Sequence, residues 1–265
     1  MTAVAVLAAV GGGYVALSGG SPNGTSYVNA AAVVHGTSAR ATQVGTSSLD
    51  LTMTMSIDGH DVSATGDGAF DYRKHLGRVD LDMAGLGTMQ EIVTRHAIFM
   101  RMPDGMAGVM ATGGKPWLEL RFSALKAAGL DMNKLMNSNP TADPASMLRV
   151  LSDATGIKQT GTETIDGAST TRYSATGSIG DLLRAEGVND VVDTSKLPAD
   201  VTDSQLHFDV WVDHTGLPRR LTMTMDLAGM GTMTMTMHFY GFGDPVTVIV
   251  PPKSVVTDIS NLAGL

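Results

Sequence analysis

The most distinctive side chains of the sequence are methionines and threonines that alternate one by one. Such runs lie at Met53–Met55, Met223–Met225 and Met233–Met237. The thioether sulfur is a soft ligand that suits Cu(I). Residues i and i+2 of a strand lie about 7 Å apart on one face, too far to bind one ion together unless the strand bends or a neighbouring strand contributes. Methionine also adapts well to varied apolar partners, so the pattern is a first indication of a lipid-type cavity.

Histidines and carboxylates form no catalytic or metal-binding pattern in the sequence. No two histidines have HxH or HxxxH spacing. Asp71, Asp80 and Asp82 lie close together in sequence, but no glycine-bearing loop arranges them as an EF-hand does. Asp82–Gly87 lacks the lysine of a phosphate-binding loop. We therefore expect no catalytic residues, no metal site and no cofactor, and we expect that the protein is not an enzyme.

The amino-acid composition excludes several further kinds of partner and site. The 265 residues carry a net charge of −8 without a basic cluster, which argues against a nucleic-acid partner. The absence of cysteine excludes disulfides, thiolate metal sites and a cysteine nucleophile. Abundant glycine, 31 residues, suits many short strands joined by turns.

The N-terminal region has the character of a targeting segment. Thr2–Gly19 is apolar and uncharged, like the central part of an export signal or a short anchor, although it lacks a preceding basic region. Leu17–Gly19 matches the residues before the lipidated cysteine of a bacterial lipobox, but position 20 is glycine, which cannot carry the lipid. We expect an export signal or anchor over 1–20, with a buried helix as the alternative, a linker over 21–47 and one binding domain over 48–265.

Alternation of apolar and polar residues predicts strands through most of that domain, because successive side chains of a strand point to opposite faces. Asp226–Gly231 separates two such runs and predicts a hairpin loop. The expected strands are Ser48–Ile57, Val62–Tyr72, Gly77–Met83, Thr88–Thr94, Ala97–Met102, Pro116–Leu120, Ile157–Ile165, Thr170–Thr176, Leu206–Val212, Leu217–Met225 and Thr232–Tyr240, with short Val109–Met110 and a last candidate at Val246–Val250.

Helical spacing appears in two insertions between the strands. Ser123–Leu135 and Ala145–Ala154 are predicted helices in the first, the latter preceded by the capping pair Asp143-Pro144. Ser178–Val192 is a predicted helix in the second. The expected fold class is α+β, with a strongly curved antiparallel sheet whose inner side covers the apolar faces of these helices. A gap between helices and sheet would be a ligand chamber.

Several short segments carry a family resemblance. They are Gly68–Tyr72, Glu91–Val93, Phe99–Pro103, Lys115–Trp117, Gly161–Tyr173 and Val210–Arg219. Together they resemble the actinobacterial LppX/LprG-type lipoproteins, which are related in shape to the LolA/LolB carriers. The resemblance implies a half-open β-barrel wrapped around helices and a hydrophobic cavity for acyl chains, on the outer side of the plasma membrane, without enzyme activity.

The sequence therefore predicts a non-enzymatic, extracytoplasmic lipid-binding or lipid-transfer protein of the cell envelope. Its expected partners are an acylated lipid or glycolipid, the outer surface of the plasma membrane and, as a further candidate, a membrane transporter or envelope protein. A sensor or regulator of the same fold and a Cu(I)-binding protein stay open as alternatives. The predicted lipid-binding residues are Met53, Met55, Phe70, Tyr72, Met83, Ile98, Met100, Met147, Leu148, Leu151, Leu206, Phe208, Met223, Met225, Met233 and Met235.

Overall fold

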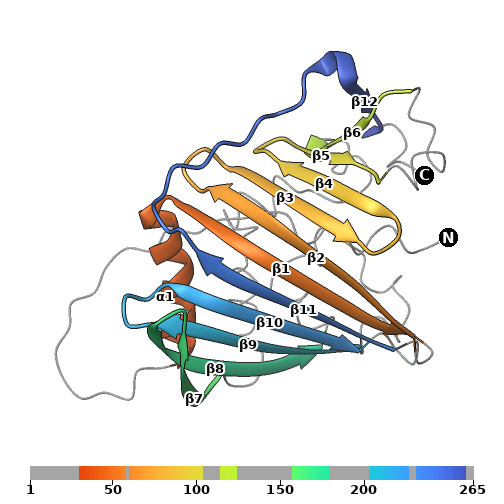
Figure 1. Cartoon of the computed structure of the whole chain (residues 1–265). Coiled ribbons are helices and arrows are strands. Elements are labelled where there is room, and N and C mark those ends of the chain that lie inside the picture. Colours follow the sequence, from red (N-terminus) through yellow and green to blue (C-terminus); the bar gives the residue numbers. More distant parts are fainter. Residues whose placement is uncertain are drawn as a thin grey trace.

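One open sheet dominates the computed structural model of the chain, which describes residues 30–57, 60–103, 114–123, 157–178, 203–226 and 231–260. Within these ranges twelve strands follow the order β12-β6-β5-β4-β3-β2-β1-β11-β10-β9-β8-β7 (Figure 1). The strands are β1 (Thr46–Ile57), β2 (His60–Asp71), β3 (Leu76–Met83), β4 (Gly87–Val93), β5 (Ala97–Arg101), β6 (Trp117–Arg121), β7 (Lys158–Ile165), β8 (Ala168–Ser178), β9 (Gln205–Asp213), β10 (Pro218–Asp226), β11 (Gly231–Tyr240) and β12 (Val256–Asp258).

Strands from the two ends of the domain meet at the centre of the sheet. β1 pairs with β2 on one side and with β11 on the other, both antiparallel. From this centre the sheet extends through antiparallel strand pairs on each side, and it curves and twists visibly in Figure 1. β12 pairs with β6 in parallel at the far edge. Segments distant in sequence therefore share one continuous surface.

The two faces of the sheet differ as the alternation predicts. Along β11 the methionines and Phe239 are buried, whereas the threonines between them are half-buried or exposed. On the polar face, the hydroxyls of Thr222 and Thr236 are 3.2 Å apart across the β10–β11 pair. The other face forms the main hydrophobic core, which extends from β3 and β4 to β8.

The helix α1 (Ala30–Val44) precedes β1 and corrects one prediction. A linker was expected over 21–47, but Ala41 of α1 is buried in the main core, and Val33 and Val44 pack against it. These positions, with the buried Thr37, are three or four residues apart, which is the helical spacing that the small side chains concealed. Among the described residues, no helix has the length and apolar character needed to cross a membrane.

The C-terminal segment corrects a second prediction. Val246–Val250 was a candidate strand, but it belongs to no strand of the sheet, and Ile249 is 76% exposed. The segment instead runs along the sheet to the short helix η5 (Lys253–Val255) and β12 (Figure 1). Val248 and Val255 pack there against Ile92 and Phe99, in a small hydrophobic cluster on the polar face. The other eleven predicted strands agree with the structure to within a few residues. Val109–Met110 and the predicted helix Ala145–Ala154 lie outside the described residues, as do the other two predicted helices except for their first residues, Ser123 and Ser178.

Candidate functional site

Methionines from three neighbouring strands form two adjacent rungs on the apolar face. A rung here means residues that lie directly opposite one another across successive strands, whose side chains share a face. The first rung, from β3 to β9, is Met83, Ala64, Met53, Met235, Met223 and Phe208. The second, from β1 to β9, is Met55, Met233, Met225 and Leu206. Nine of the predicted lipid-binding residues are thus brought together by the register.

These rungs are embedded in a much larger apolar surface. Met235 is 1% exposed, and Met223, Met225 and Met233 are also buried. Met53, Met55 and Met83 are half-buried and pack against the same core. The surface consists of unbranched, flexible side chains at its centre, a composition that adapts to ligands of varied shape.

Phe70 and Tyr72 lie in the same core, where the sheet approaches α1. Their rings stack with centroids 6.4 Å apart. The hydroxyl of Tyr72 forms a hydrogen bond with Ser47. A Cβ added at Gly77 would lie 2.6 Å from the Phe70 ring, so glycine at position 77 is what allows the ring to lie across β3. Both aromatic residues therefore have a clear structural role within the predicted lining.

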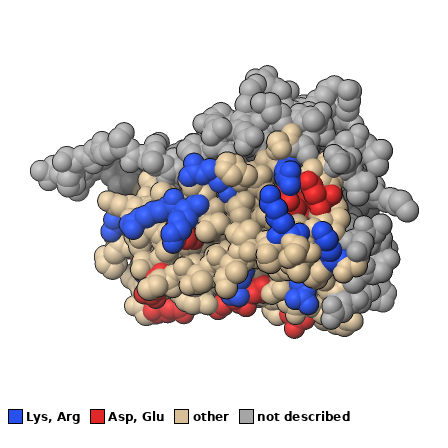
Figure 2. All heavy atoms as spheres, turned by 90° about the horizontal axis from the view of Figure 1, so that it is seen from above, with Lys and Arg blue, Asp and Glu red and all other residues tan. Residues whose placement is uncertain are grey.

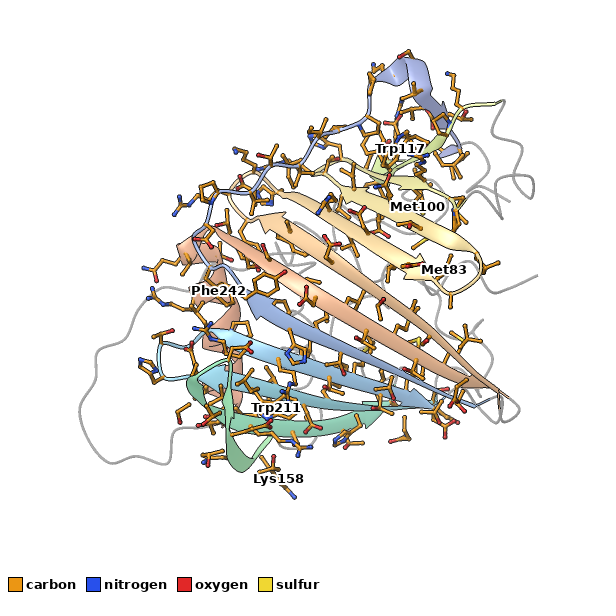
Figure 3. The ribbon with its side chains drawn as sticks, viewed as in Figure 1. Met83, Met100, Trp117, Lys158, Trp211 and Phe242 are labelled. Atoms are coloured by element: carbon orange, nitrogen blue, oxygen red, sulfur yellow. The ribbon has the colours of Figure 1, made fainter. Side chains whose placement is uncertain are left out.

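Ile98 and Met100 form a second, smaller cluster with Val93 and Phe122. Figure 3 shows Met100 on β5 and Met83 near the end of β3, at separate places on the sheet. The structure thus divides the predicted lining between two clusters. The predicted lining residues of the insert helix, Met147, Leu148 and Leu151, lie outside the described residues.

Sequence reasoning missed one functional candidate, the carboxyl of Glu91 on β4. The residue is 4% exposed, and it lies opposite Val79 on β3 and Met100 on β5. Its Oε1 atom is buried and has no hydrogen-bond partner within the part of the chain that the structure describes. Burial raises the pKa of Glu91 from 4.5 to about 7. The period-two series Met89, Glu91, Val93 was the sequence signal that places this carboxyl on the apolar face.

Several charged side chains on the polar face form ion pairs. Arg78 binds Asp67 and Asp80, each at 2.8 Å, and Arg172 binds Asp209. On the side seen in Figure 2, Lys and Arg lie in separate groups, with Asp and Glu beside several of them. Among the described residues no three His, Asp or Glu side chains are grouped as a metal site would require.

Comparisons with known proteins bear on this architecture. No family model matches the chain, and no curated protein matches it. Among solved structures, the lipoprotein LppX of Mycobacterium tuberculosis matches 84% of this chain over 100% of its own length, with 15% identity and a TM-score of 0.51. The chain has the LppX-type fold.

Two further solved structures match the chain with lower scores. LprF from Mycobacterium bovis matches 88% of this chain over 99% of its own, with 15% identity and a TM-score of 0.38. A LolA-superfamily protein from Nitrosomonas europaea matches 87% over 98%, with 9% identity and a TM-score of 0.29. The match to LppX confirms the predicted resemblance to LppX/LprG-type proteins at the level of the fold, as a large, curved, open sheet.

Proposed function

We propose that the protein binds the acyl chains of lipids on the apolar face of its sheet, as a carrier on the outer side of a membrane. The observation that carries the proposal is the pair of methionine rungs across β1, β11 and β10, set in an apolar face that continues from β3 to β8. Each acyl methylene buried there would contribute about 0.8 kcal/mol, so a long chain needs few polar contacts. The LppX-type fold supports the proposal.

The chamber itself belongs to this proposal. The open sheet would form half of a barrel, and the predicted helix Ala145–Ala154 would cover the apolar face from the other side. In this arrangement an export segment over 1–20, followed by a lipid-binding domain that includes α1, describes a protein that works in the cell envelope. The protein would act by binding and release, without catalysis.

A matched pair of variants on β1 tests the lining. Met53 is half-buried on the apolar face, whereas the adjacent Thr52 is exposed on the other face. We expect Met53→Asp to lower the lipid retained by the purified protein at least tenfold, because a carboxylate opposes burial of a hydrocarbon chain. Thr52→Asp should retain the lipid. Equal retention by folded Met53→Asp protein would contradict the proposal.

Copper binding is a second candidate function that the register favours. Two methionines of one strand are about 7 Å apart, too far to bind one ion together. This limit does not apply to Met53, Met235 and Met223, because they come from three adjacent strands and face the same side. However, a cation in this apolar core would lose its hydration with no anionic group facing it from these rungs. Replacing these three methionines with leucine separates the two functions, because leucine keeps the apolar volume and removes the sulfur. We expect lipid retention to persist in that triple variant.

A further inference from the structure

Glu91 interrupts the apolar face at one defined place. Its rung runs through Leu49, Gly68, Val79, Glu91, Met100 and Leu118. Along its own strand the neighbours on the same face are Met89 and Val93, which are 3% and 6% exposed. The carboxyl therefore lies between the main core, to which Met89 belongs, and the smaller cluster around Ile98.

No charged group faces Glu91 from the neighbouring strands. On this face β3 presents Gly77, Val79, Leu81 and Met83, β5 presents Ile98 and Met100, and β6 presents Leu118 and Leu120. The nearby Arg78 and Arg101 belong to the opposite face, because they lie opposite Ile92 and Gln90. The sheet thus supplies Glu91 with neither a counter-ion nor a hydrogen-bond donor.

A buried polar atom without a partner costs free energy and is rare in folded proteins. Replacement by leucine would remove that cost, so packing alone gives no reason for a glutamate at position 91. A ligand that supplies the missing partner would give such a reason.

We propose that protonated Glu91 donates a hydrogen bond to the ester carbonyl oxygen of an acyl lipid bound on the apolar face. This inference rests on the proposed lipid-binding function and adds the hydrogen bond that the ligand must accept. The ligand class is then an uncharged, ester-linked acyl lipid segment, with its chains along the methionine rungs and an ester group at β4.

The chemistry of the carboxyl distinguishes this class from charged lipids. A protonated carboxyl provides one O–H donor, whereas the ionised form only accepts hydrogen bonds. The raised pKa, about 7, keeps a large fraction protonated at neutral pH. An anionic head group would be repelled by the ionised form, and an ammonium group would have to be buried with the carboxylate at a high cost in desolvation.

The test compares two ligands of matched length, methyl octadecanoate and octadecane, by displacement of an uncharged fluorescent dye from the full chain. We expect Glu91→Leu to weaken binding of the ester about tenfold and to change binding of the alkane less than twofold. Glu91→Gln, whose amide also donates a hydrogen bond, should bind the ester within about threefold of the unmodified protein.

The pH dependence provides a readout that a structural role would not change. Between pH 6 and pH 8.5 the unmodified protein should lose ester affinity several-fold, because ionisation removes the donor, and Glu91→Gln should not. Unchanged ester affinity in Glu91→Leu, or ester affinity that rises with pH, would overturn the inference while the lipid-binding proposal stands. If the unmodified protein binds neither ligand, the proposed function fails and the inference fails with it.

Discussion

Two buried carboxyls at different places on the sheet, Asp213 and Glu91, are 5% and 4% exposed but have opposite surroundings. Asp213 ends β9 and accepts hydrogen bonds from the backbone N–H groups of Thr215 at 2.8 Å and Leu217 at 3.1 Å, and from Nε of Arg219 at 2.7 Å. Burial alone would raise the pKa of Asp213, but these donors hold it below its ordinary value. Burial of Glu91 is uncompensated, so its pKa is raised to about 7.

The difference shows how to separate structural from functional buried charges in this fold. Among the described residues the donors to Asp213 come from the next six positions, in the β9–β10 turn and at the start of β10. They are present whenever the hairpin forms, so Asp213 stabilises the turn that joins β9 to β10. The Oε1 atom of Glu91 has no donor among the described residues, so a ligand could supply the missing hydrogen-bond partner.

A new buried carboxyl, introduced by Met235→Asp, should produce the largest effect. Met235 is 1% exposed at the centre of the first rung, where its neighbours on the adjacent strands are the apolar Met53 and Met223. We expect a loss of at least about 4 kcal/mol in the free energy of unfolding, measured with urea at pH 7. Thr234→Asp, on the adjacent position and the opposite face, is the control and should lose far less. Equal losses would show that the two faces do not differ as described.

Asp213→Asn should destabilise the protein by about 3 kcal/mol, because it removes the charge that Arg219 and the turn amides surround. Asp166→Asn is the control, since Asp166 is an exposed turn residue with φ of 48°, a conformation that asparagine also adopts. The contribution of Asp213 should be present above its unfolded pKa of 3.8 and be lost as pH falls through its lower folded value. A stability loss no larger than that of Asp166→Asn would contradict the structural role of Asp213.

Glu91→Leu should have the opposite sign and stabilise the ligand-free protein. The folded pKa lies above the unfolded one, so ionisation opposes folding, and stability falls as pH rises from about 4.5 through about 7. The substitution should therefore gain up to roughly 3 kcal/mol at pH 8.5 and much less below pH 5. Gln90→Leu is the control on the opposite face, where Gln90 binds Asp80. A pH-independent effect would contradict the uncompensated burial of Glu91.

The smallest effect should come from the hydroxyls on the polar face. Thr222 and Thr236 share one hydrogen bond across β10 and β11. A double-mutant cycle with Thr222→Val and Thr236→Val should give a coupling of about 0.5 kcal/mol. A coupling as large as the stability loss expected for Asp213→Asn would mean that the polar face contributes more to stability than we infer.

Much of the fold was predictable because it depends on local alternation. The runs around Met53, Met223 and Met235 fixed both the strands and the face of each methionine. The pairing of β1 with β11 was not predictable in the same way, because alternation gives faces but no partner. The rungs, and with them the geometric support for copper, appeared only with the register.

Each feature that the sequence analysis predicted wrongly or overlooked has a physical cause. Val246–Val250 has strand composition, but it packs through side chains such as Val248 and lies in no strand of the sheet. The small residues of α1 hid its helical spacing. Glu91 was considered only as part of a family motif, and its cross-strand neighbours were needed to show that it is buried among apolar side chains.

Lipid binding is tested most directly by native mass spectrometry of the full chain, purified without detergent, together with organic extraction of the molecules that co-purify with it. We predict a co-purifying, uncharged, ester-linked acyl lipid that is depleted in Met53→Asp. A ligand-free mass that gains one copper ion on addition of Cu(I) would contradict lipid binding and favour the methionine rungs as a metal site. A ligand-free mass that binds neither would contradict both functions.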